Sequence, residues 1–174
     1  IWWIMVNICS FELKIVYNKE NLMKKFAAFL LSSFLLAQYD YSLVDINPTS
    51  DTYEDSVGTS YFEESITLHY FGYFTWGTCT ARFEQLNELY NSLVSDGLPI
   101  KLIGVGKSSY INGLSNWTNG NNSSVCSDES PFQVWSDWNA SQRDLFMLDI
   151  NGNLILHQNV TSGLPDDLED LIYS

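Results

Sequence analysis

The chain has 174 residues, with 21 Asp and Glu against 8 Lys and Arg, and a formal net charge of −13 at pH 7. Such an acidic surface repels polyanions, so nucleic acid and anionic membrane surfaces are poor partners and neither is expected. Hydrophobic residues make up 45% of the sequence, enough for one domain with a sizeable core.

The first 37 residues read as two segments that precede the folded domain. Residues 1–22 look unrelated to the rest of the chain, and we expect them to be an upstream read-through of the reading frame. Residues 23–37 contain two lysines, an apolar run of about a dozen residues and a final Ala37, the layout of a cleaved signal peptide. A membrane anchor that stays uncleaved, or a buried core helix, is the alternative, although a membrane span needs about 20 apolar residues. We therefore predict an exported protein, secreted or periplasmic, with a single domain over residues 38–174 and no membrane contact after signal cleavage.

The first elements of the domain are predicted from apolar runs and their periodicity. Residues 41–48 form a short apolar stretch closed by Asn-Pro, a strand or an extended arm, and residues 53–64 are polar and predicted to be a loop. Residues 65–74 are β-branched and aromatic almost throughout, as in a strand buried on both faces. Apolar residues then recur at three- and four-residue spacing over 83–93, which predicts an amphipathic helix that ends near Gly97.

The second half of the domain completes an α/β pattern. Residues 100–106 are another apolar run, so strand, helix and strand make a right-handed βαβ unit with a parallel pair. Residues 108–130 are a polar insertion, and residues 131–138 are a short helix with Pro near its first turn. Two apolar runs flank the Asn-Gly pair at 151–152, which predicts an antiparallel hairpin, and a helix over 164–172 closes the chain. The predicted fold class is α/β, a central mixed sheet flanked by helices.

One turn in this pattern carries the candidate chemistry. Between the strand over 65–74 and the next helix, Trp76-Gly-Thr-Cys79 has the spacing of a C-x-x-C motif with tryptophan in place of the first cysteine. In an α/β redox domain this motif opens a helix, and the partial positive charge of the helix N-terminus stabilises a thiolate there. Trp76 and Cys79 are therefore the candidate catalytic residues.

This order of elements resembles the thioredoxin-like fold over roughly residues 41–172. The most telling pieces are the turn just described, the run Ile103-Gly-Val-Gly and the run from Arg143 to Leu154. The last run is similar to the thioredoxin-family strand that ends in Asp and turns through Gly into the next strand, but Arg143 stands where the family usually has a cis-proline. The resemblance implies a single thioredoxin-like domain.

The missing proline and the altered turn make the chain similar to the N-terminal domain of selenoprotein P and related exported redox proteins, which have a selenocysteine-x-x-cysteine turn. Selenocysteine is encoded by UGA, which some translation tables read as tryptophan, so we suspect that Trp76 is a mis-decoded selenocysteine. The adjacent Trp2 and Trp3 would be read-through stops under the same table. The resemblance implies an exported thiol- or selenol-dependent oxidoreductase, with residue 76 as nucleophile and Cys79 as resolving thiol. Its substrate would be a disulfide-containing protein or a small peroxide.

The literal sequence supports a second interpretation. A genuine Trp76 would be an aromatic plug beside a buried Cys79 and would make the site redox-inert. The chain would then be a redox-inactive thioredoxin-like binding module. The codon decides between the two, because UGG at position 76 excludes selenocysteine.

Other candidate residues lie outside the turn. Cys126, near the end of the 108–130 insertion, could pair with Cys79, act as a distant second thiol or be a small buried residue, and its polar surroundings favour exposure. His69 and His157 lie in predicted strands and are expected to be structural. No metal-ligand spacing joins them to Cys79, so neither a metal nor another cofactor is predicted.

Overall fold

The computed structural model describes residues 39–173. The read-through segment predicted over 1–22 and the signal peptide predicted over 23–37 lie outside these residues and stay predictions. Within 39–173, no helix has both the length and the apolar composition that crossing a membrane requires.

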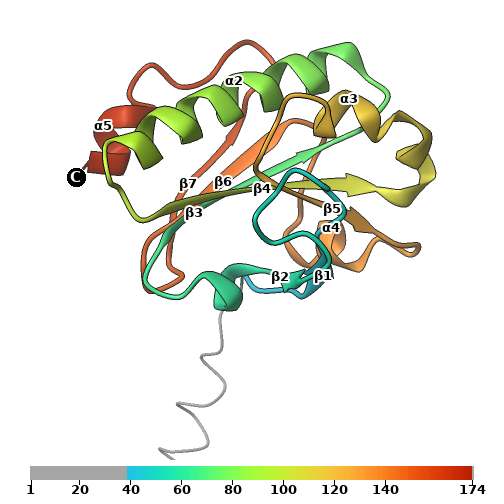
Figure 1. The fold of residues 1–174 in the computed structure, drawn as a ribbon, viewed down its shortest axis with the longest axis horizontal. Coiled ribbons are helices and arrows are strands. Elements are labelled where there is room, and N and C mark those ends of the chain that lie inside the picture. The colour runs from blue at the N-terminus through green and yellow to red at the C-terminus, as the bar shows by residue number, and fades with distance from the viewer. Residues whose placement is uncertain (1–38, 174) are drawn as a thin grey trace, which may run out of the picture. The chain divides into compact units, whose positions relative to one another are not determined.

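The centre of the fold is a five-stranded sheet with the order β5-β4-β3-β6-β7 (Figure 1). Its strands are β3 (Ile66–Gly72), β4 (Ile100–Lys107), β5 (Ser124–Asp128), β6 (Asp144–Leu148) and β7 (Leu154–Asn159). β4 runs parallel to its neighbours β3 and β5, whereas β6 runs antiparallel to β3 and β7. The predicted βαβ unit and the predicted hairpin are both confirmed.

Helices cover both faces of this sheet. They are α2 (Gly77–Ser95), α3 (Ser115–Thr118), α4 (Gln133–Asp137) and α5 (Leu168–Tyr173), together with the 3-10 helices η1 (Thr59–Phe62) and η2 (Ser108–Gly113). Figure 1 shows α2 and α5 on one side of the sheet, and α4 on the other side with the small antiparallel pair β1 (Leu43–Val44) and β2 (Ser56–Val57). This is the predicted α/β architecture, a mixed sheet flanked by helices.

The side chains of β3 alternate between two apolar clusters, because successive residues of a strand point to opposite faces. Leu68 and Tyr70 pack with Phe83 of α2 in the first cluster. Phe71 faces the other way and packs with Trp135 of α4 in the second cluster. β3 is therefore buried on both faces, as its β-branched and aromatic composition predicted.

Two glycines of β4 let α2 and the turn before it approach the sheet closely. A Cβ on Gly104 would lie 2.7 Å from Cε2 of Phe83 and 2.9 Å from Cζ3 of Trp117. These two rings stack on each other with their centroids 4.6 Å apart. A Cβ on Gly106 would overlap the ring of Phe74, two residues before Trp76. The absence of side chains at Gly104 and Gly106 therefore lets the candidate site lie close above the sheet.

Two segments that the sequence analysis assigned to loops contain secondary structure. Residues 53–64 include β2 and η1, and residues 108–130 include η2, α3 and β5. The only apolar residues of β5 are Val125 and Cys126, so no apolar run marks this strand in the sequence. Its position depends instead on long-range hydrogen bonds, such as the one at 2.9 Å from the Val125 N–H to the Asp45 carboxylate.

Candidate functional site

The candidate site begins where β3 ends. Residues 73–76 form the turn into α2, whose N-cap is Trp76 with extended backbone dihedrals (φ −101°, ψ 119°). The Trp76 N–H donates to the Tyr73 carbonyl at 3.2 Å, and the Trp76 carbonyl accepts from the Thr80 N–H at 3.0 Å. Within the described residues, the side chain of residue 76 makes no capping hydrogen bond. These backbone bonds, together with the one from the Asn116 side chain to the Phe74 carbonyl at 2.9 Å, close the turn, so a different side chain can occupy position 76 without loss of them.

Trp76 and Cys79 lie on the same turn but differ sharply in exposure. Trp76 is 50% exposed, and its ring packs edge-on against Tyr73 with the centroids 5.7 Å apart. Cys79, the third residue of α2, is 0% exposed and belongs to the core cluster between α2 and the sheet. A genuine tryptophan at 76 is therefore a half-exposed surface residue rather than the buried plug that the sequence analysis expected, because the N-cap position projects it from the end of the helix.

Two N–H donors from the loop before β6 contact the sulfur of Cys79. The Gln142 side chain donates from Nε2 to Sγ at 3.3 Å, and Nη1 of Arg143 lies 3.9 Å from Sγ. From the sheet side, the hydroxyl of Tyr70 donates to the Cys79 backbone carbonyl at 3.2 Å, and burial raises the pKa of that hydroxyl. Donors of this kind, one of them cationic, stabilise negative charge on a sulfur.

Arg143 occupies the position where the resemblance expected a cis-proline. Its backbone is left-handed (φ 70°), a conformation that is uncommon for a residue with a Cβ. Two hydrogen bonds hold it there: its N–H donates to the Phe71 carbonyl at 2.7 Å, and its carbonyl accepts from the Val160 N–H at 2.8 Å. Within residues 39–173 the cis peptide bond is the one before Pro131. In the sequence, Arg143 stands out only as a departure from the family pattern, and no motif marks Gln142 beside it.

A surface of stacked aromatic rings adjoins Trp76. The ring of Tyr73 stacks on Tyr110 with centroids 4.3 Å apart and on Trp135 with centroids 5.6 Å apart. The ammonium of Lys107 lies over the Trp135 ring, 4.5 Å from its centroid, a cation–π contact. Trp76 is the most exposed aromatic side chain of this group. The site therefore combines a buried thiol with an accessible aromatic surface.

Cys126 lies away from this site. It is 0% exposed in β5, opposite Val105 of β4, and belongs to the cluster on the other face of the sheet from Cys79. Both thiols are free. Burial, and then the nearby Asp45 carboxylate, raises the pKa of the Cys126 thiol well above its usual value. The exposure that its polar surroundings favoured is wrong, because the surrounding residues form a strand and not a loop.

The two histidines have structural surroundings. His69 is fully buried in β3, where burial lowers its pKa to about 3. Nε2 of His157 lies 3.1 Å from the Asp144 carboxylate, and its ring stacks on Phe146. Across residues 39–173, no group of three His, Cys, Asp or Glu side chains is arranged to hold a metal ion.

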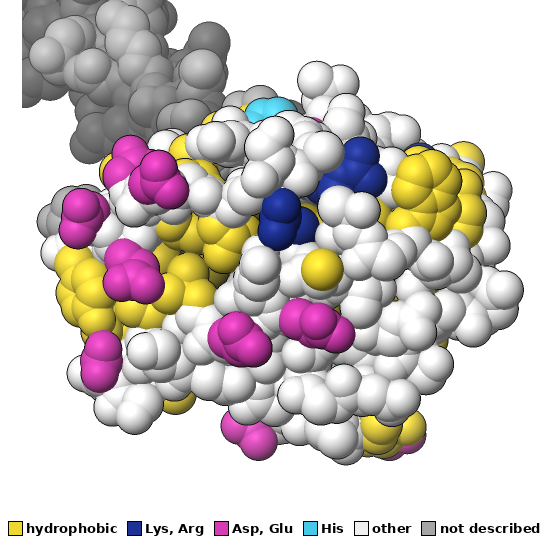
Figure 2. Space-filling model, turned by 90° about the horizontal axis from the view of Figure 1, so that it is seen from above, with side chains coloured by type: hydrophobic (Ala, Val, Ile, Leu, Met, Phe, Trp, Pro, Cys, Tyr) yellow, Lys and Arg dark blue, Asp and Glu magenta, His cyan; other side chains and the backbone are white. Residues whose placement is uncertain are grey.

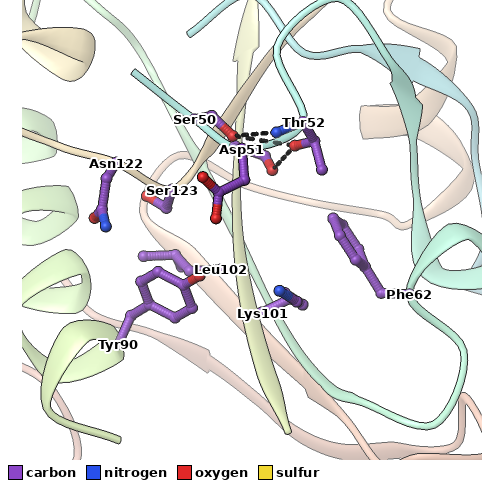
Figure 3. Close-up of a pocket in the computed structure, with 10 residues that line it drawn as sticks. Ser50, Asp51, Thr52, Phe62, Tyr90, Lys101, Leu102, Asn122 and Ser123 are labelled. Carbon is purple, nitrogen blue, oxygen red and sulfur yellow. Dashed lines mark hydrogen bonds between the residues drawn. The ribbon is translucent and has the colours of Figure 1, made fainter. Parts of the chain in front are cut away.

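A small pocket lies at the far end of β4 from the turn. Its lining residues come from the loop after β1, from η1, α2 and β4, and from the start of β5 with the segment before it (Figure 3). Its volume of about 20 Å³ is enough for about one water molecule. Lys101 lines it and pairs in register with Thr67, at the start of β3, whereas the candidate site lies just past the end of β3. This pocket is therefore separate from the thiol site and too small for an organic substrate.

No protein-family model and no curated protein matches the sequence. Solved structures match the fold. A Chlorobium tepidum protein proposed to be the thiol:disulfide interchange protein DsbE has a TM-score of 0.63 and 17% identity, over 79% of this chain and 93% of that one. A secreted Mycobacterium tuberculosis disulfide oxidoreductase homologous to E. coli DsbE has a TM-score of 0.61 and 10% identity, over 78% and 96% of the two chains. The thioredoxin domain of a thiol-disulfide oxidoreductase from Bacteroides vulgatus has a TM-score of 0.59 and 13% identity, over 79% and 93%.

These similarities span nearly the whole of each solved chain and most of residues 39–173. At such low identities they bear on the backbone arrangement and not on the activity. Together with the strand order and the helix that opens at Trp76-Gly-Thr-Cys79, they establish that the chain has a thioredoxin-like fold.

Proposed function

We propose that the protein is an exported thiol- or selenol-dependent oxidoreductase that acts on a disulfide or a peroxide through residue 76 and Cys79. One observation carries the proposal: a half-exposed side chain at the α2 N-cap is followed, three residues later, by a buried thiol. A redox pair needs this asymmetry, because the nucleophile must meet substrate while the resolving thiol stays protected until the second step.

Selenocysteine, or cysteine, at position 76 would allow a two-step exchange with a disulfide. The chalcogen anion of residue 76 bonds to one sulfur of the substrate disulfide, and the other sulfur leaves as a thiolate that takes a proton from water. The Cys79 thiolate then attacks the chalcogen, forms the 76–79 bond and expels the second substrate thiolate, which takes up the proton that Cys79 lost. Two electrons pass from the pair to the substrate, and an external dithiol restores the reduced pair. Gln142 and Arg143 would stabilise the charge on Sγ during the second step.

The comparisons support disulfide chemistry and export only by analogy of fold. One of the matched structures is named as a secreted disulfide oxidoreductase, and another as a thiol-disulfide oxidoreductase. The signal-peptide pattern over 23–37 agrees with export. The selenium part of the proposal rests on the sequence resemblance to the N-terminal domain of selenoprotein P.

The proposal is tested by the codon at position 76 and by one variant. We expect UGA in the nucleotide sequence. Trp76→Cys, a sulfur surrogate, is expected to reduce insulin disulfides with a dithiol as electron donor, or to turn over hydrogen peroxide, whichever substrate class is right. Trp76→Ser is the matched control, since it has the size of cysteine without a redox-active sulfur. Absence of both activities in a folded Trp76→Cys protein contradicts the oxidoreductase.

A redox-inactive binding module is the second candidate function. The observation that favours it is the half-exposed indole of Trp76, which continues the stacked surface of Tyr73 and Tyr110. If UGG encodes residue 76, we expect Trp76→Ala to abolish capture of a partner and Cys79→Ser to leave it unchanged. Trapping of mixed disulfides through Cys79 counts against this candidate.

A further inference from the structure

Two arginine side chains converge on one loop beside Cys79. Arg82, from the second turn of α2, donates from Nε to the Val160 carbonyl at 2.8 Å and from Nη2 to the Thr161 carbonyl at 3.2 Å. Arg143 donates from Nε to the Thr161 hydroxyl at 2.7 Å, and its Nη1 is the atom near Sγ of Cys79. Both guanidinium groups are therefore fixed on the same loop, and that of Arg143 lies beside the thiol.

Within residues 39–173, neither guanidinium has a carboxylate partner. The remaining contact of Arg82 runs from Nη1 to the Gln85 side-chain carbonyl at 2.7 Å. The acceptors of the two groups are thus amide carbonyls, a hydroxyl and a sulfur. Among the described residues the one ion pair joins His157 and Asp144. In a chain with 21 acidic residues against 8 basic ones, two arginines that the described carboxylates leave unneutralised form a local excess of positive charge.

The surface shows the same separation of charge. Figure 2, which looks down on the side of the sheet where α2 lies, shows Lys and Arg side chains next to one another, with the Asp and Glu side chains of that view lying apart from them. A guanidinium binds a carboxylate through two parallel N–H···O bonds, because its N–H groups match the spacing of the two oxygens. The arginine side chains of this surface have no carboxylate partner among the described residues, and a substrate can supply one.

We propose that Arg82 and Arg143 select disulfides that carry a carboxylate close to the reactive sulfur. This inference rests on the proposed oxidoreductase function and names its substrate class. In the intermediate of the exchange, the substrate sulfur is bonded to the chalcogen of residue 76. Cys79 must reach that chalcogen to complete the reaction. A carboxylate a few bonds from that sulfur therefore lies within reach of the guanidinium groups around Cys79.

The salt concentration of the assay determines how strongly the preference for a carboxylate-bearing disulfide is expressed. The net charge of −13 repels an anion at long range, while the arginine pair attracts it at short range. At about 0.15 M salt the Debye length is about 8 Å, so remote acids are screened and the arginines still act on a bound substrate. At about 1 M salt, where the length is about 3 Å, the attraction should weaken as well.

The test uses three disulfides of matched size on the reduced Trp76→Cys protein in single-turnover mixing, so no external reductant takes part. Dithiodipropionate has two carboxylates, bis(hydroxyethyl) disulfide is neutral and cystamine has two ammonium groups. Each rate constant is divided by that of the same disulfide with free mercaptoethanol, which removes differences in intrinsic reactivity. At about 0.15 M salt we expect the normalised rate for the dicarboxylate to exceed that for cystamine by about tenfold or more.

Arg82→Gln is the deciding variant, because Arg82 does not contact Sγ of Cys79 and its loss should not alter the thiol directly. We expect it to reduce the dicarboxylate-to-cystamine ratio about threefold or more. Lys101→Gln removes the same charge at the opposite end of β4 and should leave the ratio within about twofold. An unchanged ratio in Arg82→Gln, or a preference for cystamine, overturns the inference.

The two proposals fail in different ways. If none of the three disulfides reacts and hydrogen peroxide is not turned over, the oxidoreductase fails. If all three disulfides react without a charge preference, only the substrate class fails. Binding of thiodipropionate, a thioether that cannot be reduced, tests the arginine pair in the Trp76 protein even when no disulfide reacts. We expect it to shift the arginine Nε–H signals in nuclear magnetic resonance spectra, and to do so less in Arg82→Gln. Absence of any shift in the parent protein overturns the inference.

Discussion

Replacement of His69 by glutamine should remove a pH dependence from the stability of the domain. His69 is fully buried in β3. Its Nδ1 lies 2.9 Å from the Tyr41 hydroxyl, its Nε2 lies 2.9 Å from the Thr67 hydroxyl, and its ring is 4.6 Å from that of Trp138. In the described part of the chain no carboxylate contacts the imidazole to compensate a proton, so burial favours the neutral ring.

The size of the effect is set by the pKa of His69, which burial lowers from 6.5 to about 3. Below pH 6.5 the unfolded chain binds a proton that the native chain does not take up until about pH 3. The contribution of the neutral His69 to the free energy of unfolding is therefore fully present above pH 6.5. It is lost as the pH falls toward 3, at about 1.4 kcal/mol per pH unit. The total loss is on the order of 5 kcal/mol, as large as the whole free energy of unfolding of a marginal domain.

The assay is urea unfolding of the parent protein and His69→Gln between pH 7 and pH 4. The acidic residues are common to both proteins, so their contributions cancel in the difference between the two free energies of unfolding. That difference should change by about 1.4 kcal/mol per pH unit below pH 6. Parallel curves for the parent and His69→Gln would refute the reasoning.

Three further predictions concern packing and access. Gly104→Ala should lower the free energy of unfolding by about 1–3 kcal/mol in urea, because the new methyl group would press on Phe83. Gly77→Ala, with open space around the new atom, should not lower it, and an equal loss in both variants would contradict this. Asn87→Ala should cost about 2 kcal/mol in the same assay, since Oδ1 accepts from the Ser123 N–H and hydroxyl; a wild-type midpoint would contradict it. Cys79 is 0% exposed, so iodoacetamide should label it slowly in the native Trp76 protein and rapidly in urea; fast labelling of the native protein would contradict this burial.

The sequence was sufficient where a local pattern carries the structure. The apolar run of β3, the spacing of the α2 apolar residues and the Asn-Gly turn after β6 each predicted its element. β5 was missed because it has one apolar residue on each face, Val125 and Cys126, and because side chains from the Asp45 region hold it in register. Hydrogen bonds between residues 80 positions apart leave no periodic signal in the sequence.

Some residues of the candidate site could likewise be predicted from a local pattern in the sequence, and others could not. Trp76 and Cys79 were found because their spacing on one turn is itself the signal. Gln142 and Arg143 contact Cys79 from 63 and 64 positions away, and only the antiparallel pairing of β3 with β6 brings them there. Arg82 lies on the predicted helix, but its role depends on the loop after β7, whose path the sequence did not indicate.

The placement of the two thiols on opposite faces of the sheet limits what oxidation can do to this domain. A bond between Cys79 and Cys126 would close a long loop and restrict the unfolded chain by about 4 kcal/mol, but the sheet lies between the two sulfurs. A bond between residue 76 and Cys79 closes a short loop, and its restriction of the unfolded chain stabilises the domain by about 2 kcal/mol. In the proposed oxidoreductase, a change of redox state therefore alters the free energy of unfolding by about 2 kcal/mol, roughly half of what a bond between the two faces of the sheet would contribute.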